Sequence, residues 1–566
     1  MGIVASVLRV FHGGVHPPEN KDISERCAIE PLALPKRLYV PLHQHIGAPC
    51  QPCVAAGDKV KKGQMIGTAS GFISAPVHAP TSGTIVAVEE HSVGHPSGLT
   101  MLCAVLDSDG EESWVDGLQG INDPSQAEPS AIRNKIRDAG IVGLGGASFP
   151  SFVKMSPPEG KTVELLLING VECEPYLTCD ARLMEERSKD LIEGIEIMLH
   201  ALQCKECVIG IEDNKPKAIS TMTKAASDSA YVKVVVLPVM YPQGSEKQLI
   251  EVVTGRQVPS GKLPLDTGVI VHNVATAVAI RDAVKFGRPL IQRLVTVTGR
   301  GINTPANLEV LMGTSVSALV EHCGGLKPGV RKVINGGPMM GTALHNLDVP
   351  VVKGTSGILC LMPGDFSENE EQACIRCGSC VQVCPISLVP SQMAWLSKHD
   401  QFDTLPDSNL SDCIECGTCA YVCPANIPLV HYFRYGKASL AAIQKAEQQA
   451  EVDKSRVKNK EERVAREKAA KERKKAEMKA KMAAKMAAKK KAEAEAASAQ
   501  GDSAPGSVAT PAPKEETAAP GGDDKAAKAA KAAKAAKAAK AAKAAKAAKA
   551  ARAARAAKAA KESADQ

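Results

Sequence analysis

Eight cysteines, arranged as two copies of one spacing, constrain this chain more than any other feature. The spacing is Cys-x2-Cys-x2-Cys-x3-Cys-Pro, and its copies begin at Cys374 and Cys413. Three thiolates two residues apart can wrap a small polyhedral cluster in one tight loop, and this spacing binds 4Fe–4S clusters in bacterial proteins. Zinc is the alternative metal, but it usually takes two ligand pairs separated by a long spacer. The repeat therefore predicts two 4Fe–4S clusters.

The fourth cysteine of each copy is expected to serve the other cluster, as it does in two-cluster ferredoxins. The predicted ligand sets are Cys374, Cys377, Cys380 and Cys423 for the first cluster, and Cys413, Cys416, Cys419 and Cys384 for the second. The insert between the copies, Pro390–His399, has the pattern of a helix. We therefore expect residues 366–434 to form a helical two-cluster ferredoxin domain that carries single electrons.

The rest of the chain falls into segments of different character. Between residues 128 and 290, helical runs alternate with buried-strand runs, which predicts a multidomain α/β protein with a mostly parallel sheet in this part. The expected segments are an N-terminal lead at 1–40, a β barrel-sandwich domain at 41–120, the α/β domain at 128–290, a small α+β module at 291–362, the ferredoxin domain at 366–434, a charged helix at 437–500, a flexible linker at 501–524 and a Lys-Ala-Ala repeat tail at 525–566.

Composition and charge exclude several classes of protein. No apolar run approaches the ~18 residues that a membrane span requires, and Met1–Phe11 lacks the basic region of a secretory signal. The 18 cysteines are therefore expected to be reduced and to serve metal binding rather than disulfides. The chain is acidic up to about residue 450 and strongly basic beyond it.

Polar segments of the α/β part carry the residue types of a nucleotide site. They are the glycine-rich turn Gly143–Pro150, Lys154, the strand end Asn169–Pro175, and the segments Tyr241–Glu246 and His272–Thr276. Glycines let a backbone approach a phosphate closely. Polar residues at the carboxyl ends of parallel strands are where open α/β sheets bind ligands. The segments therefore predict a bound nucleotide or flavin.

In order and spacing, these segments resemble the NADH-binding flavoprotein subunit of respiratory complex I. The resemblance implies bound FMN, with NAD(H) as the substrate. It implies FMN contacts from Gly143, Gly145, Lys154, Asn169, Asn273 and Thr276, and it places Glu174, Tyr241 and Glu246 on the nicotinamide side, with Glu174 as the catalytic residue. Val171 and Ser245 stand where that family has acidic residues, which keeps open a subunit without nicotinamide binding.

The layout from Phe11 to Phe433 resembles the C subunit of the Rnf, or Rsx, electron transport complex. The matching pieces are Gly13–Lys21, the Gly143–Pro150 loop, Glu172–Tyr176 and the two cysteine motifs. The resemblance implies a peripheral subunit on the cytoplasmic face of the bacterial inner membrane, within an NADH:ferredoxin-type oxidoreductase that transports Na⁺ or H⁺. Its expected partners are the other membrane subunits of that complex and a ferredoxin-type subunit. Residues 291–362 are then expected to be a β-grasp, ligand-binding module.

The two ends of the chain raise separate questions. Residues 54–88 resemble biotinyl and lipoyl domains, but Phe72 stands where those domains carry a modified lysine, so we expect a rigid barrel. From Lys525 to Lys561 a cation recurs every third residue. Such a tail suits an anionic membrane surface, while a solubilising appendage is the other interpretation. No nucleic acid is expected, because no aromatic residues are interleaved to stack bases.

The sequence thus favours an iron–sulfur flavoprotein in which electrons pass between NAD(H), FMN and two 4Fe–4S clusters. Two alternatives stay open. One is a soluble reductase of related build that acts on cobalamin. The other is a non-enzymatic electron wire or scaffold subunit without nicotinamide binding.

Overall fold

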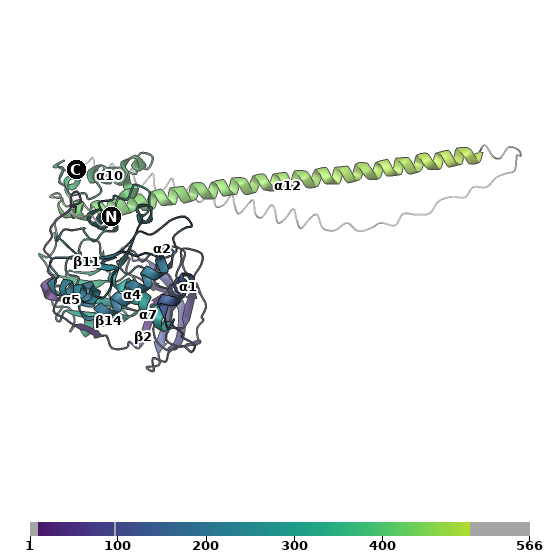
Figure 1. The fold of residues 1–566 in the computed structure, drawn as a ribbon. Helices are drawn as coiled ribbons and strands as arrows, with labels where there is room; N and C mark the ends of the chain where they lie inside the picture. Colours follow the sequence, from purple (N-terminus) through teal and green to yellow (C-terminus); the bar gives the residue numbers. More distant parts are fainter. Residues whose placement is uncertain (1–8, 96–97, 498–566) are drawn as a thin grey trace. The chain divides into compact units, whose positions relative to one another are not determined.

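The computed structural model describes residues 9–95 and 98–497 (Figure 1). The chain divides into two compact units between Ser455 and Arg456. The expected linker at 501–524 and the Lys-Ala-Ala tail at 525–566 lie outside the described residues. Among the residues that the structure does describe, no helix is both long and apolar enough to cross a membrane.

The N-terminal part of the first unit is a barrel of short antiparallel strands. One sheet has the order β2-β8-β7-β4 and the other β3-β5-β6. The strands are β2 (Arg37–Pro41), β3 (Gln51–Pro52), β4 (Lys59–Val60), β5 (Met65–Thr68), β6 (Val77–His78), β7 (Gly83–Ser92) and β8 (Thr100–Ser108). Leu38, Ile66 and Leu106 are fully buried between the sheets. The exposed tip residue Phe72 packs edge-on against Phe152 of the next part, with ring centroids 5.7 Å apart.

The central part is a four-stranded sheet in which every neighbouring pair is parallel, which confirms the expected mostly parallel sheet. Its order is β11-β10-β9-β12. The strands are β9 (Leu165–Asn169), β10 (Cys207–Glu212), β11 (Val232–Leu237) and β12 (Val269–Asn273). The helices are α1 (Pro129–Asp138), α2 (Ser151–Lys154), α3 (Cys179–Glu186), α4 (Ser188–Leu202), α5 (Pro216–Ala226), α6 (Glu246–Thr254) and α7 (Val274–Phe286).

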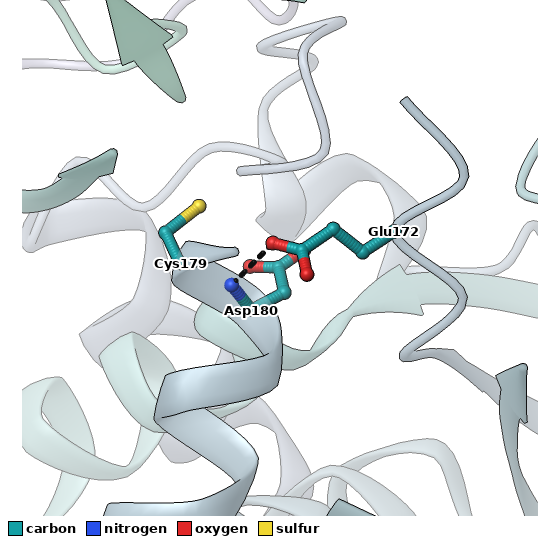
Figure 2. Close-up of side chains that lie close together, drawn as sticks. All are labelled: Glu172, Cys179 and Asp180. Atoms are coloured by element: carbon teal, nitrogen blue, oxygen red, sulfur yellow. Dashed lines mark hydrogen bonds between the residues drawn. The ribbon is translucent and has the colours of Figure 1, made fainter. Parts of the chain in front are cut away.

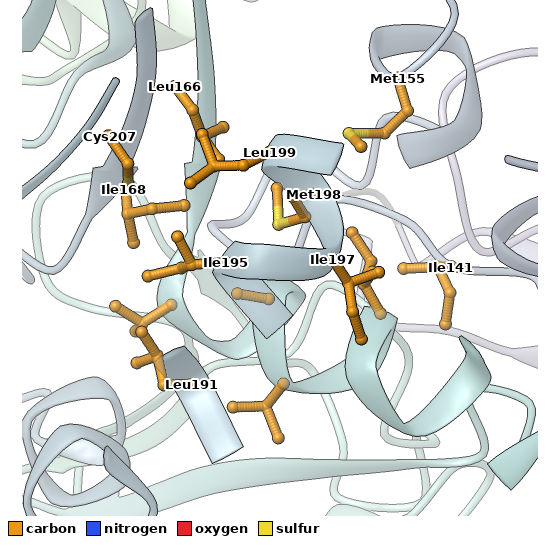
Figure 3. Close-up of a cluster of buried hydrophobic side chains, with 14 of the residues drawn as sticks. Ile141, Met155, Leu166, Ile168, Leu191, Ile195, Ile197, Met198, Leu199 and Cys207 are labelled. Carbon is orange, nitrogen blue, oxygen red and sulfur yellow. The ribbon is translucent and has the colours of Figure 1, made fainter. Parts of the chain in front are cut away.

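Helix α4 forms the centre of the largest core (Figure 3). Its apolar side chains, among them Ile195 and Leu199, gather with Leu166 and Ile168 of β9. The sequence pattern favours one helix over Asp180–Leu202, but the structure has two, which meet at Arg187. The backbone there leaves helical geometry, at φ −126° and ψ 33°, and the Arg187 guanidinium pairs with Glu309 at 2.8 Å.

The third part is a six-stranded mixed sheet with the order β1-β14-β13-β17-β15-β16. Its elements are β13 (Gln292–Thr298), β14 (Ala306–Leu311), α8 (Val316–His322), β15 (Lys332–Asn335), β16 (Thr342–Ala343) and β17 (Gly357–Leu361). Strand β1 (Ile29–Pro31) comes from the expected N-terminal lead and pairs in parallel with β14. The lead is therefore part of this sheet, and its residues from Arg37 onward belong to the barrel.

Buried cations join these parts. The Lys353 side chain is 1% exposed, and its amine donates to the carbonyls of Pro76 in the barrel, at 3.0 Å, and of Gly140 in the central part, at 2.7 Å. Burial lowers the pKa of Lys353 to about 8. Arg293 donates to the Leu144 carbonyl at 2.6 Å. The glycine-rich turn is thereby fixed from the third part of the chain.

The cysteine motifs lie among short helices, in the region labelled α10 in Figure 1. The helices are α9 (Ser379–Gln382), α10 (Pro390–Lys398) and α11 (Thr418–Tyr421), packed around Met393, Leu405 and Phe433. Helix α10 confirms the helix expected in the insert. Helix α12 (Leu429–Ala497) follows, and in the second unit its residues 456–496 are exposed and form i,i+4 ion pairs such as Arg463–Glu467.

Candidate functional site

Two predicted flavin residues lie side by side at the point where the sheet order reverses. Strand β9 is followed along the chain by β10 and β11 on one side, while β12 lies on its other side. Asn169 ends β9 and Asn273 ends β12, and the two are partners in the strand register. Open α/β sheets bind ligands in the crevice at such a switch point, outside the carboxyl ends of the strands.

Each asparagine is held by hydrogen bonds that fix its amide. Asn169 donates to the Gly244 carbonyl at 2.8 Å. The Asn273 oxygen accepts from the Ala275 backbone N–H at 2.8 Å and so caps α7, while its nitrogen donates to Asp180 at 2.6 Å. Capping by asparagine satisfies one of the unpaired N–H groups at a helix start. The end of β9 is thereby tied to the segment before α6, and the start of α7 is tied to α3.

The glycine-rich turn lies against the start of α7. Its ends close through the Gly143 N–H, which donates to the Phe149 carbonyl at 2.8 Å. The Leu144 N–H donates to the Thr276 hydroxyl at 2.9 Å. A Cβ added to Gly145 would lie 3.4 Å from the Cβ of Asn273, whereas one added to Gly146 would meet no atom within 4 Å. The loop thus contacts the predicted residues Asn273 and Thr276 and leaves its Gly146 side open.

Lys154 and Glu246, which are both predicted site residues, form an ion pair. The Lys154 amine lies 2.6 Å from a Glu246 oxygen and donates to the Val271 carbonyl at 3.2 Å. His272, next to Asn273, is buried, and burial together with the Lys154 charge lowers its pKa to about 3. This histidine is therefore neutral, and the charges at this edge are those of the Lys154–Glu246 pair.

Two buried side-chain nitrogens on the surrounding segments have no hydrogen-bond partner among the described residues. They are Nε2 of Gln243, beside Gly244, and Nε2 of His272, beside Asn273. Buried polar groups are usually paired, so unpaired ones call for an explanation such as a ligand. Together with the open side of the glycine loop and the positive Lys154, they fit a flavin phosphate and ring at this edge.

Sequence reasoning left three neighbouring groups unassigned. Glu172 accepts the Asp180 N–H at 2.7 Å and the Ala181 N–H at 3.3 Å, which caps α3 (Figure 2). Burial raises the pKa of Glu172 to about 7 and also raises that of Asp180. The buried Lys21 amine donates to the carbonyls of Glu172 and Glu174, at 2.8 and 3.0 Å. The sequence did carry a signal for two of them, because Lys21 and Glu172 lie within the motifs that resemble the Rnf C subunit.

The side chains of Glu172, Cys179 and Asp180 also gather as possible metal ligands, with one ligand atom from each within 4.8 Å of the others (Figure 2). Their polar atoms already have partners in the fold. Glu172 caps α3, Asp180 accepts from Asn273, and the Cys179 thiol donates to the Ser356 carbonyl. The trio accordingly acts as a support for the asparagine at the switch point.

Glu174 and Tyr241, predicted on the nicotinamide side, are engaged by other parts of the chain. The Glu174 carboxylate accepts the N–H groups of Met339 and Met340, at 3.2 and 2.8 Å. Burial raises its pKa to about 7. The Tyr241 hydroxyl donates to the Cys416 carbonyl at 2.7 Å, and the residue is 2% exposed. Burial raises the pKa of Tyr241 well above its ordinary value, so this hydroxyl stays a donor.

The cysteines of the second predicted set converge. Cys384, from the first motif, lines one pocket together with Cys413, Cys416 and Cys419 from the second motif. The Thr418 hydroxyl lies 3.3 Å from the Cys416 sulfur. Four thiols around one pocket are the donor set that a 4Fe–4S cluster requires, and the crossed arrangement fits a two-cluster ferredoxin domain.

The cysteines of the first predicted set lie nearer the surface. Cys374 and Cys377 are exposed, and Cys380 and Cys423 are half-buried. Cys374 and Cys377 lie close enough to Cys380 for their charges to raise its pKa, after burial as the main cause. Ser391, in the first turn of α10, lies close enough to the Cys380 sulfur to oppose that rise in pKa. Cys374, Cys377 and Cys380 are therefore neighbours near the surface, and Cys423 as their fourth partner stays a prediction.

Comparison with known proteins gives a match for each folded part. Residues 9–111 match the model of the RnfC barrel sandwich hybrid domain, and residues 136–282 the Nuo51 FMN-binding domain. Residues 294–343 match the SLBB domain, and residues 373–427 the 4Fe–4S dicluster domain. The chain is 46% identical over 433 residues, 76% of its length, to the C subunit of the proton-translocating ferredoxin:NAD(+) oxidoreductase complex of Clostridium ljungdahlii, of which it covers 94%. The chain belongs to the RnfC family.

A second relative agrees with this membership. The C subunit of the ion-translocating oxidoreductase complex of Rhodobacter capsulatus is 45% identical over 453 residues, which cover 78% of this chain and 87% of that protein. Among solved structures, the NAD⁺-reducing NiFe hydrogenase in its air-oxidised state is similar, with 18% identity and a TM-score of 0.38 over 50% of this chain and 54% of that one. As an RnfC family member, the chain combines a barrel-sandwich, an FMN-binding, an SLBB and a 4Fe–4S part, and the β-grasp character expected for residues 291–362 stays a prediction.

Proposed function

We propose that this chain is the electron-transfer subunit of an ion-translocating oxidoreductase complex. In this role it passes electrons between NAD(H), FMN and two 4Fe–4S clusters, toward other subunits of the complex or ferredoxin. One observation carries the proposal. A single compact unit holds both the switch-point site and the four-thiol pocket, and Tyr241 of the first donates a hydrogen bond to Cys416 of the second.

We assign the flavin to the edge where β9 and β12 end. Gly143 and Gly145 supply a backbone without Cβ atoms, and Asn169, Asn273 and Thr276 supply fixed polar groups. Lys154 supplies the positive charge. When bound, FMN supplies the conversion between a two-electron hydride and single electrons. The chain's residues bind and orient it through these fixed groups.

We assign the nicotinamide side to Glu174 and Glu246. Both are carboxylates of the kind that orients a nicotinamide amide group by accepting its N–H. Glu246 is held by Lys154, and Glu174 is held by two backbone N–H groups. The alternative of an electron wire without nicotinamide binding draws on two facts. Val171, where the complex I family has an acid, is fully buried, and Tyr241 is enclosed.

The two cysteine sets are proposed as the ligands of the two clusters, with Cys384 and Cys423 exchanged between motifs. The proposed location is the cytoplasmic face of the bacterial inner membrane, where the other subunits of the complex hold the chain. The repeated lysines of the tail are proposed to bind anionic lipids, since each near-surface cation contributes about 1 kcal/mol before screening by salt.

The test is anaerobic purification of the full chain with iron, sulfide and flavin quantified, followed by titration with NADH observed optically. We expect about eight irons, one FMN, and bleaching of both chromophores by NADH. Lys154→Met should lose flavin while keeping iron. Lys161→Met is the matched control, because Lys161 also pairs with a carboxylate, Asp266 at 3.0 Å, but lies outside the site.

Iron without flavin in the wild-type protein would refute the oxidoreductase assignment and leave an electron wire. Flavin and NADH bleaching with a cobalamin substrate, in the absence of membranes, would instead support the soluble reductase. Equal flavin loss from both lysine variants would refute the role given to Lys154.

A further inference from the structure

The segment Tyr241–Glu246 touches both redox sites at once. On one side, Glu246 pairs with Lys154, and the Gly244 carbonyl accepts from Asn169. On the other side, the Tyr241 hydroxyl donates to the carbonyl of Cys416, a thiol of the four-cysteine pocket. Few residues therefore separate groups assigned to the flavin from a cluster ligand.

Further contacts reach the same cluster loops. The Gln248 amide donates to the Pro385 carbonyl at 3.2 Å, and the Gly14 N–H donates to the Val383 carbonyl at 3.0 Å. Val383 and Pro385 are the two neighbours of Cys384. All three contacts, counting that of Tyr241, thus fall on or beside ligands of the second set.

Tyr241 is itself fixed in place. Its backbone exchanges two hydrogen bonds with Val15, at 2.8 and 2.9 Å. Its ring lies in a small buried cluster with Val15 and Cys416, against which Met339 and Ile414 pack. A hydroxyl held in this way can keep the Cys416 carbonyl at one distance and one orientation.

The two thiol sets differ in how they face the rest of the chain. Cys416 and Cys419 are 7% and 6% exposed, whereas Cys374 and Cys377 are exposed. A Cβ added to Gly417 would lie 2.7 Å from the Met339 carbonyl, but one added to Gly378, at the equivalent place in the first motif, would meet nothing within 4 Å. The second set is therefore covered by Tyr241 of the central part and Met339 of the third part, and the first set is open.

We propose that Tyr241 is a positioning residue that fixes the loop of Cys416 against the flavin site, so that the cluster of Cys384, Cys413, Cys416 and Cys419 is the inner one. This inference rests on the proposed function. Two electrons enter as one hydride from NADH and leave one at a time. They pass through the inner cluster and then the outer one, to an oxidised ferredoxin-type partner.

The test compares Tyr241→Phe with Tyr435→Phe in the full-length holoprotein. Tyr435 is the matched control, since its hydroxyl also donates a hydrogen bond, to Asp400 at 2.6 Å, but on the exposed side of the cysteine region. After rapid mixing with NADH, Tyr241→Phe should bleach its flavin at the wild-type rate and its clusters several-fold more slowly. Tyr435→Phe should match the wild type in both.

Electron paramagnetic resonance of the dithionite-reduced protein identifies the affected cluster without NADH. Tyr241→Phe should alter the signal and midpoint potential of one cluster only, the one that a Cys384→Ser substitution removes. Unchanged spectra and cluster rates, or a change in the other cluster, would overturn the inference. If Tyr241→Phe loses iron, Gln248→Leu repeats the test at the second contact.

The wild-type protein separates the two possible failures. Absence of flavin, or of bleaching by NADH, contradicts the proposed function. If the wild-type protein holds flavin and is bleached by NADH, and Tyr241→Phe gives the same rates and spectra, only the positioning role is contradicted.

Discussion

Replacing Gly194 with alanine should damage the flavin site from a distance. Gly194 lies in α4 where that helix crosses α7, and a Cβ there would stand 2.1 Å from the Ala277 carbonyl oxygen and 2.7 Å from its carbon. Ordinary contacts begin at 3.4 Å, so α7 must move by more than 1 Å. The first turn of α7 carries Asn273 and Thr276, so the displacement reaches the switch point.

Two opposing effects decide whether Gly194→Ala raises or lowers the free energy of unfolding. Alanine in place of glycine in a helix contributes about 1 kcal/mol of stability from backbone entropy alone. Overpacking a buried contact costs ~1–3 kcal/mol, and the neighbour here is backbone, which cannot rotate away. We therefore expect Gly194→Ala to be less stable than the wild type. A misplacement of about 1 Å at a site can cost ~100-fold in function, so flavin affinity should fall at least tenfold.

The assay is urea unfolding followed by circular dichroism, together with a flavin dissociation constant. Glu196→Ala is the matched control, because it adds alanine on the exposed face of the same helix. It should leave flavin affinity unchanged. A Gly194→Ala protein that is more stable than the wild type and retains its flavin would refute the reasoning about this helix contact.

Three further outcomes follow from individual contacts. Burial raises the pKa of Glu174 from 4.5 to about 7, so the folded state binds more protons between these values and stability falls by about 3 kcal/mol as pH rises through that window. Glu174→Gln should flatten this slope in pH-dependent unfolding, and an unchanged slope would contradict it. Asn273→Ala should cost about 1 kcal/mol of stability through the lost cap of α7, while Asn273→Ser should keep the cap and still lose flavin in a binding titration. Ser391→Ala should lower the potential of the cluster assigned to Cys380, measured by redox titration, because the Ser391 hydroxyl beside that sulfur favours the more negative, reduced state; a shift in the other cluster would contradict it.

Local sequence patterns predicted much of the fold. The strands of the central sheet are short apolar runs, and β10, Cys207–Glu212, is buried along its whole length. The crossed pocket of Cys384 with the second motif follows from the motif alone, since it depends on cysteine spacing. The gathering of Asn169, Asn273 and Thr276 follows from the rule that the carboxyl ends of parallel strands meet at one edge.

Features that depend on long-range contacts left no comparable signal in the sequence. Strand β1 has only three residues, none fully buried, and its partner β14 lies far along the chain, so nothing local marks it as a strand. The break at Arg187 has no glycine or proline to announce it, and the partner of Arg187 there, Glu309, lies 122 positions along the chain. In the same way, the family pattern marks Glu174 and Tyr241 as site residues, but only the packed structure shows Met339, Met340 and Cys416 as their partners.

The internal repeat shows how one motif comes to serve two roles. Both copies have the same spacing and each has a glycine before its short helix, yet one copy is covered by Tyr241 and Met339 and the other faces outward. Adding an electron makes a cluster more negative, and burial in an apolar region disfavours added charge. The first set gains solvent exposure, which favours added charge, whereas the second set receives hydrogen bonds at sulfur from the Leu388 N–H to Cys384 and from the Glu415 N–H to Cys413, which favour it as well. The same spacing therefore supports two differently tuned sites, an exposed one and an enclosed one whose sulfurs are hydrogen-bonded by the fold itself.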